Sequence, residues 1–259
     1  MKFTNLVLLL LTIPSLSFAA DQAGYYRMWQ GFRKSTVSSR EFQRQLPGFM
    51  QSTVDVYGGV LNQYLVAVPP ADKPSFVPDE FALVALDSED AYQRIRGTPE
   101  GKAYGESHWQ LFDRSNSSSA PYENFFPLQP RTLKSGQAYD MIGRPVNWNQ
   151  GLTTFYIGLR KGSESFLTRL SNHVRDVAHS FHGKGLRGYL VIANENYEAA
   201  YMNWDSKEDM QAAFASPEGK AIAADAGEFM EALQWSEAED FNGSSVATGR
   251  FYSTGRLIP

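Results

Sequence analysis

A short motif occurs twice in the chain, at residues 98–103 as TPEGKA and at residues 216–221 as SPEGKA, 118 positions apart. Other residues recur in phase at the same distance without a gap, namely Asp87, Ser88 and Gln93 against Asp205, Ser206 and Gln211. A repeated motif with further matches in phase indicates internal duplication. The chain is therefore predicted to contain two diverged copies of one folding unit.

Both copies of the motif have the features of a helix N-terminus. Thr98 and Ser216 can accept hydrogen bonds from free backbone N–H groups, and the proline after each occupies the first helical position, where no N–H partner is lost. The glutamate that follows complements the positive end of the helix dipole. We interpret the motif as structural, with Gly101 and Gly219 as positions that permit close packing.

Hydrophobic periodicity divides each copy into strand, helix, strand, strand, helix and strand, with a short helix before the second long one. In copy one the predicted strands are 24–32, 61–68, 80–86 and 122–133, and the predicted helices are 39–57, 89–96 and 98–114. In copy two the strands are 153–159, 186–193, 198–204 and 245–258, and the helices are 164–181, 207–214 and 216–233. A serine- and proline-rich stretch from 115 to 150 is expected to connect the copies over the surface.

The segment 205–225, DSKEDMQAAFASPEGKAIAAD, resembles the ethyl tert-butyl ether degradation (EthD) family, in which a similar run ends the third strand and opens the second helix. The resemblance covers the sequence of the C-terminal half of each copy. In the N-terminal half only the order of strands and helices is similar. It implies the dimeric α+β barrel superfamily. The expected fold is α+β, with two tandem ferredoxin-like units forming an intrachain pseudo-dimeric barrel. The first unit is placed at 20–134, a linker at 135–150 and the second, EthD-like unit at 151–259.

Two of the four histidines are candidate catalytic residues. His108 falls on the apolar stripe of the second long helix of copy one, where copy two has Ala226, and His173 falls on the apolar stripe of the first helix of copy two. An imidazole with a pKa near neutrality can act as acid or base. The alternative is a core histidine bonded to a backbone carbonyl or a tyrosine hydroxyl.

The resemblance also bears on these histidines. Many EthD-like proteins carry a histidine eight residues after a phenylalanine of the first helix; here His173 follows Phe166 by seven, and Met50 stands eight residues after Phe42. In the haem-degrading branch of the superfamily the iron ligand lies on the helix of His108. Haem is therefore a candidate cofactor, although the residues require none, and without an H-E-x-x-H pattern or any cysteine no dedicated metal site is expected.

Further polar and aromatic residues are candidates for substrate contact. Aromatic side chains in predicted strands and helices can line an apolar cavity, and they can equally form ordinary core. Asp225 ends the EthD-like segment and aligns with Ser107. The substrate-binding candidates are Tyr26, Trp29, Tyr64, Tyr104, Trp109, Trp204 and Asp225.

Residues 1–19 have the pattern of a secretory signal peptide, with Lys2, an apolar run at 6–13 and small residues at 17 and 19. The protein is therefore expected to be periplasmic or secreted, and without a cysteine it has no lipid anchor or disulfide. The apolar run is shorter than the roughly 20 residues that cross a bilayer, so no membrane partner is expected. The net charge of −4 without a basic cluster excludes a nucleic-acid partner.

Two functions stay open at this point. The first is a cofactor-independent enzyme of the lyase, dehydratase or monooxygenase type, which acts on a small cyclic or aromatic compound through a pocket histidine. The second is a periplasmic module that binds a small ligand or haem without catalysis. Either would function as a monomer with an internal pseudo-dimer, or as a homodimer.

Overall fold

The computed structural model describes residues 23–124, 132–162 and 165–254, so the predicted signal peptide lies outside the described residues. Copy one consists of β1 (Tyr25–Gly31), α1 (Ser39–Tyr57), β2 (Leu61–Val68), β3 (Glu80–Leu86), α2 (Glu89–Arg96), α3 (Pro99–Leu111) and β4 (Ser118–Ala120). Copy two consists of β7 (Leu152–Arg160), α4 (Phe166–Phe181), η1 (His182–Lys184), β8 (Leu186–Ala193), β9 (Tyr197–Trp204), α5 (Lys207–Ala215), α6 (Pro217–Phe229) and β10 (Met230–Glu237). Four short strands follow the copies: β5 (Tyr122–Asn124), β6 (Gln137–Asp140), β11 (Glu239–Asp240) and β12 (Arg250–Ser253).

The two copies share one sheet topology. The strands of copy one lie in the order β4-β1-β3-β2, and those of copy two in the equivalent order β10-β7-β9-β8. Within each copy these neighbouring strands pair antiparallel, and both long helices cover one face of the sheet. Each copy is therefore a ferredoxin-like unit, as predicted.

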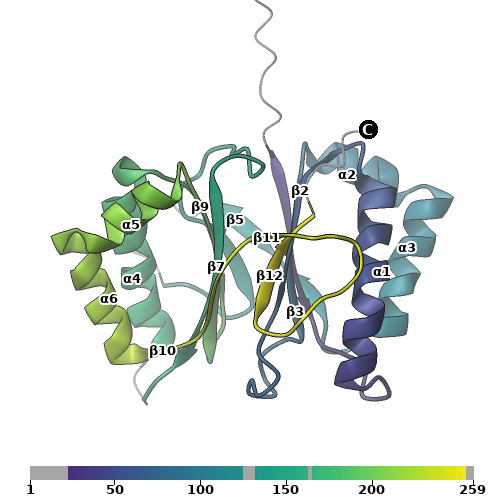
Figure 1. Ribbon diagram of the computed structural model, residues 1–259, viewed down its shortest axis with the longest axis horizontal. Helices are drawn as coiled ribbons and strands as arrows, with labels where there is room; N and C mark the ends of the chain where they lie inside the picture. Colours follow the sequence, from purple (N-terminus) through teal and green to yellow (C-terminus); the bar gives the residue numbers. More distant parts are fainter. Residues whose placement is uncertain (1–22, 125–131, 163–164, 255–259) are drawn as a thin grey trace, which may run out of the picture.

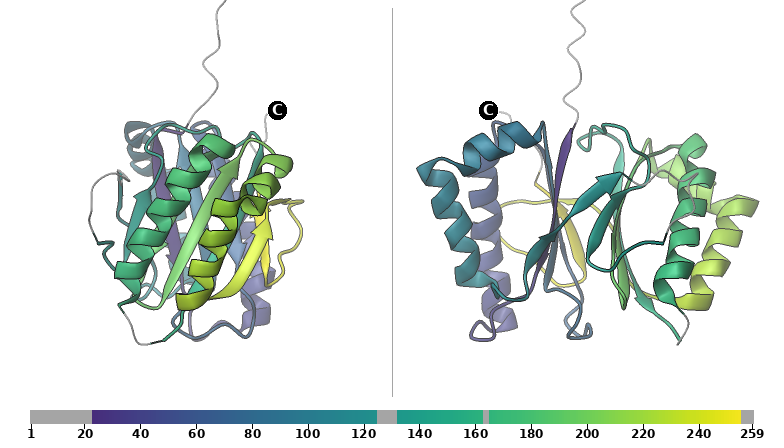
Figure 2. Two further views of the ribbon diagram at one scale, coloured as in Figure 1. Left: turned by 90° about the vertical axis from the view of Figure 1, so that its left-hand side faces the viewer. Right: turned by 180° about the vertical axis from the view of Figure 1, so that it is seen from behind.

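The two sheets pack face to face and the helices lie outside them, so the molecule has four layers (Figure 1), seen again from behind in Figure 2. Side chains of both sheets, among them Phe81, Leu83, Phe155 and Ile192, fill the space between the sheets. The outer face of each sheet packs against its own helices. Strands β2 and β9 are buried along their whole length, because both of their faces are covered. The fold is the predicted intrachain pseudo-dimeric α+β barrel.

Each sheet gains, at one edge, a strand from the chain segment that follows the other copy. β12, near the C-terminus, pairs antiparallel with β2 of copy one, and β6, which follows copy one, pairs antiparallel with β8 of copy two. β5 and β11 extend these edges in parallel. The stretch 115–150, expected to connect the copies, thus contributes β4 to the first sheet and both β5 and β6 to the second sheet.

The predicted fourth strands, 122–133 and 245–258, were wrong in the described part of the chain. The fourth strand of copy one is β4, which ends at Ala120, and residues 250–253 form the exchanged strand β12. The predicted helix 216–233 was too long, because α6 ends at Phe229 and Met230 pairs with Arg160 to begin β10. Local periodicity does not show which sheet a strand joins, and this is the physical reason for the two errors in the strands.

The repeated motif forms the N-terminus of α3 and of α6, as predicted. The Thr98 hydroxyl accepts a hydrogen bond from the Gly101 N–H at 3.0 Å, and the Ser216 hydroxyl accepts one from the Gly219 N–H at 3.1 Å. A Cβ atom at Gly101 would lie 2.1 Å from the carbonyl oxygen of Ile95, and one at Gly219 would lie 2.2 Å from a carbonyl oxygen of the preceding helix. The glycines therefore permit the close approach of two consecutive helices.

Substitution of Gly101 by alanine is expected to lower the free energy of unfolding by about 1–3 kcal/mol, because the added methyl group forces α2 and α3 apart. Gly105 lies in the interior of the same helix with no atom within 4 Å of its would-be Cβ, so Gly105→Ala is the matched control. That control is expected to be neutral or to stabilise the protein by about 0.5–1 kcal/mol. Urea unfolding of both variants measures the difference, and equal stabilities would contradict this role of Gly101.

No helix among the described residues has the length and apolar character of a membrane span.

Candidate functional site

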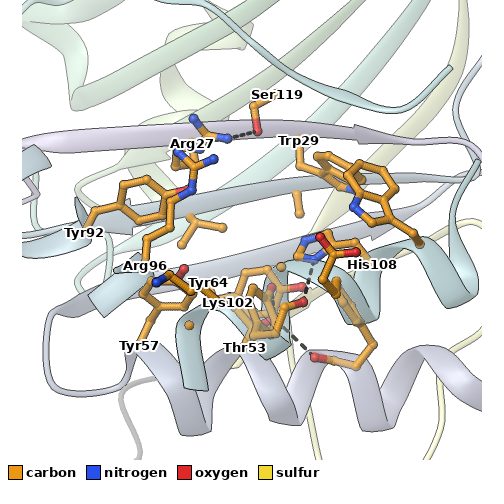
Figure 3. A pocket seen from close by; sticks show the side chains of 18 of the residues that line it. Arg27, Trp29, Thr53, Tyr57, Tyr64, Tyr92, Arg96, Lys102, His108 and Ser119 are labelled. Atoms are coloured by element: carbon orange, nitrogen blue, oxygen red, sulfur yellow. Dashed lines mark hydrogen bonds between the residues drawn. The ribbon is translucent and has the colours of Figure 1, made fainter. Parts of the chain in front are cut away.

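A cavity of about 530 Å³ lies between the sheet of copy one and its helices. Its walls come from β1, β2 and β3 on one side and from α1, α2 and α3 on the other (Figure 3). Aromatic side chains dominate the lining: Trp29, Phe49, Tyr57, Tyr64, Tyr92, Tyr104 and Trp109. The size and the apolar walls are typical of a site for a small organic ligand.

His108 projects from α3 into this cavity and is surrounded by aromatic rings. Its ring centroid lies 4.6 Å from that of Phe49 and 5.1 Å from that of Trp29. Nδ1 lies 3.1 Å from the backbone carbonyl oxygen of Tyr104, which can only accept, so Nδ1 carries the proton in the neutral ring and Nε2 keeps its lone pair. Burial lowers the pKa of His108 to about 4, and the charge of Arg27 acts in the same direction. At neutral pH His108 is therefore an uncharged base.

A buried carboxyl group lies behind the wall of the cavity. Glu80 begins β3 and is 0% exposed, and neither of its carboxyl oxygens has a hydrogen-bond partner among the described residues. Burial raises the pKa of Glu80 to about 8, while Trp29 and Tyr64 oppose the shift; both lie close by, yet neither reaches hydrogen-bond geometry. An unpaired carboxyl with a perturbed pKa beside a cavity is typical of a functional site.

Copy two contains a second cavity, of about 280 Å³, at the equivalent place between its sheet and its helices α4 and α6. Buried His173 projects into it from α4, and its Nδ1 lies 3.0 Å from the Asp225 carboxylate. Arg169 pairs with the other carboxylate oxygen at 3.1 Å. The Asp225 carboxylate accepts the hydrogen bond from Nδ1–H, so Nε2 of neutral His173 again keeps the lone pair. Burial lowers the pKa of His173, and Asp225 opposes this effect.

The two histidines come from opposite helices of equivalent units. The buried faces of α1 and α4 superpose at an offset of 124, with Phe42, Leu46 and Met50 against Phe166, Leu170 and Val174. This offset sets Phe49 against His173, while the motif offset of 118 sets His108 against Ala226. Each copy therefore has one histidine between its two long helices, supplied by the second long helix in copy one and by the first in copy two.

The buried carboxyl recurs in copy two. Glu198 of β9 stands 118 residues after Glu80, and the Tyr189 hydroxyl donates to its Oε1 at 3.1 Å. The strand registers set Tyr189 of β8 against Tyr64 of β2. Burial raises the pKa of Glu198 to about 7, and the Tyr189 hydroxyl opposes the shift. A histidine, a tyrosine and a buried glutamate thus occur together in both copies.

Four of the aromatic candidates from the sequence lie in the first cavity: Trp29, Tyr64, Tyr104 and Trp109. Tyr26 lies between the sheets, where its hydroxyl accepts from the indole N–H of Trp148 at 3.1 Å. Trp204 packs in the core beneath α4 against Phe181. Asp225 contacts His173 and Arg169 from outside the lining of the second cavity.

Several residues of the two sites had no place among the candidates from the sequence. Glu80 and Glu198 are the most consequential, and a signal for them existed, because a charged residue opens an apolar strand in both copies at the motif offset. Phe49 and Arg27 had no such signal, since their roles depend on which helix or strand faces the cavity. Among the described residues, no group of three or more His, Asp or Glu side chains is arranged to hold a metal ion.

No protein-family model and no curated protein matches the chain. A solved structure from Fusobacterium nucleatum with a provisional monooxygenase assignment is 11% identical, and the match covers 86% of this chain and 96% of that chain with a TM-score of 0.41. One from Lactobacillus acidophilus with the same assignment is 9% identical over 89% and 96%, with a TM-score of 0.39. SnoaB, a cofactor-independent oxygenase from Streptomyces nogalater, is 12% identical over 35% and 93%, with a TM-score of 0.30. At these identities and TM-scores the fold is assigned from this chain's own strand order and packing, and not from the similar structures.

Proposed function

We propose that the chain is a cofactor-independent enzyme that transfers protons on a small aromatic or cyclic compound, with one histidine base in each copy. The observation that carries the proposal is the common state of the two rings. Nδ1 of His108 and of His173 each faces an acceptor, so both neutral rings keep the lone pair on Nε2, inside a cavity with aromatic walls. A base held in this way is ready to accept a proton from a bound substrate.

The buried glutamates supply the complementary acid. Nε2 of the histidine removes a proton from an acidic C–H or O–H group of the substrate. Glu80, with a pKa of about 8, and Glu198, with a pKa of about 7, retain a proton near neutrality. In copy two Glu198 lines the cavity beside Tyr189, so it can return a proton to another atom of the substrate directly or through the tyrosine hydroxyl. In copy one Tyr64 lines the cavity and Glu80 lies behind it, so the return of the proton requires the Tyr64 hydroxyl to move into hydrogen-bond geometry with the carboxyl. Net proton relocation of this kind underlies isomerisation, elimination and dehydration.

An EthD-like affiliation and export complete the proposal. The segment 205–225 that resembles the EthD family forms α5 and the start of α6, next to the cavity of copy two. The N-terminal sequence has the pattern of a signal peptide. The mass of the protein from the periplasmic fraction or medium is expected to correspond to a chain that begins at residue 20. A full-length mass would contradict export.

Exchange of acidic protons for deuterium tests the enzyme directly, because it requires a base and no oxidant. Phenylpyruvate in D₂O, followed by proton NMR, reports loss of its CH₂ signal, and anthrone provides an uncharged aromatic probe with an acidic CH₂ group. The protein is expected to accelerate exchange of at least one probe over buffer. Acceleration that survives removal of both histidines would contradict the proposal.

Haem binding without catalysis is the second candidate, and one observation favours it. The Nδ1–H of His108 bonds a backbone carbonyl, as is usual for a histidine that ligates a metal through Nε2, and Arg27 and Arg96 line the same cavity, where they would pair with haem carboxylates. Titration with haemin distinguishes the candidates. A Soret shift that His108→Ala abolishes, with no proton exchange, would favour haem binding over the enzyme.

A further inference from the structure

The cavity of copy one contains arginines at positions where copy two has uncharged residues. Arg27 on β1 and Arg96 at the end of α2 line it, and the exposed Lys102 and Arg114 are the other cations of its lining. The strand registers set Arg27 against Thr154, because Arg27 pairs with Val84 and Thr154 pairs with Met202. The motif offset sets Arg96 against Phe214, which lines the second cavity. The two copies have therefore diverged in charge at the same end of the same cavity.

Arg27 and Arg96 form no ion pair with a described residue, and Arg96 is exposed. Arg27 is half-buried; it donates a hydrogen bond to the Ser119 hydroxyl at 2.8 Å and lies over the ring of Tyr92 at 5.2 Å. The ion pairs between described residues involve other arginines and lysines. Glu106 is the acidic residue of the cavity lining, and it is exposed. A half-buried guanidinium with donors to spare favours a bound anion.

Arg27 and Arg96 lie at one end of this cavity, and Arg114, which is exposed, lies at the other end over the ring of Trp109 at 5.3 Å. Figure 3 shows Arg27 and Arg96 near Tyr92 at one end, and His108 beside Trp29 at the other. Both arginines lower the pKa of Tyr57 against the stronger effect of burial, so their charges act on the same space. A ligand that spans the cavity would meet the half-buried Arg27 together with Arg96 at one end. At the other end it would meet a base between aromatic rings, with the exposed Arg114 stacked on Trp109.

We infer that the cavity of copy one binds an aromatic compound that carries a carboxylate or a similar anion, whereas the cavity of copy two binds an uncharged apolar compound. The anion lies at Arg27 and Arg96, and the ring lies towards Trp29 and His108. This inference names the substrate classes of the two proposed active sites and rests on the proposed function for the choice of the cavities. Binding of the probes is measured without turnover, so the inference and the proposed function can fail separately.

Isothermal titration with 2-naphthoate and its uncharged counterpart 2-naphthamide tests the inference on the full chain. One site for naphthoate and one for naphthamide are expected. Ala226 lines the second cavity, and Ala226→Phe, which fills it, is expected to abolish naphthamide binding alone. Arg27→Gln and Arg96→Gln are each expected to weaken naphthoate binding about 10-fold, and the double variant about 100-fold, because each removes a charge-assisted hydrogen bond.

Arg94→Gln is the matched control, since Arg94 is exposed on the same helix as Arg96 and lies outside the lining of the cavity. It is expected to bind naphthoate like the wild type. Equal affinity of the Ala226→Phe variant, whose arginines are unchanged, for both probes would overturn the inference without requiring an arginine variant to fold. Unchanged naphthoate binding in a folded Arg27→Gln/Arg96→Gln protein would also overturn it. If the protein binds the two probes with the expected preference but does not accelerate proton exchange, the proposed histidine base is refuted and the inference stands.

Discussion

Replacement of both His108 and His173 by alanine is expected to lower the rate of deuterium exchange by about 10² to 10⁴-fold, the usual contribution of a positioned general base. The reason is that Nε2 is the free lone pair in both rings, while Nδ1 is held by the Tyr104 carbonyl or by Asp225. With phenylpyruvate, which is anionic, His108→Ala is expected to account for most of the loss. Proton NMR in D₂O measures the rates, and circular dichroism measures the melting temperature.

His179 and His182 are the matched controls for this loss. Both are exposed at the C-terminal end of α4, and their alanine variants are expected to exchange protons at the wild-type rate. A sharper control relocates the base within copy one. Phe49→His combined with His108→Ala reproduces the arrangement of copy two and is expected to recover part of the activity. Wild-type rates in the double alanine variant would exclude both histidines as bases.

Replacement of Glu80 by glutamine is expected to make the protein more stable than the wild type at pH 9, by about 5 kcal/mol at most, with little difference at pH 5. The folded pKa of Glu80 is about 8, above the ordinary value of 4.5, so the folded state retains a proton that the unfolded state has released between these values. Wild-type stability therefore falls as the pH rises from 4.5 to 8. Glutamine does not ionise, so the variant lacks this loss.

Urea unfolding at pH 5 and pH 9 measures this difference. Glu198, with a folded pKa of about 7, adds a loss of the same sign, so a protein with both glutamates replaced is expected to have the flattest dependence on pH. Glu106→Gln is the control, because Glu106 is exposed. If the wild type and Glu80→Gln lost stability in parallel from pH 5 to pH 9, the buried carboxyl would not be the group that titrates.

Much of the fold was predictable from the sequence because its elements have local signals. β2, β3 and β8 match their predicted bounds, and the N-terminus of α3 and of α6 follows from the capping residue and proline of the motif. The exchanged strands β6 and β12 were not predictable, since pairing between distant segments leaves no periodicity of its own.

The candidate site was partly predictable for the same reason. His108 and His173 stood out because a polar ring interrupts an apolar helical stripe. Glu80 did not, because a charged residue at the start of a strand usually faces solvent, and its burial becomes visible only when helices are packed over that face of the sheet. The difference between Arg27 and Thr154 could be recognised only from the strand registers of both sheets.

The exchange of β6 and β12 makes the two halves of the chain dependent on each other. If either copy were produced alone, its sheet would lack the strand that closes one edge, and the strand meant for its partner would have no sheet to join. Such a half exposes an open edge together with a matching free strand, the combination that drives domain swapping and aggregation. The two units thus complete each other's sheets, so unfolding is expected to be a single cooperative event for the whole molecule. A substitution in one cavity therefore acts on a fold that both units maintain.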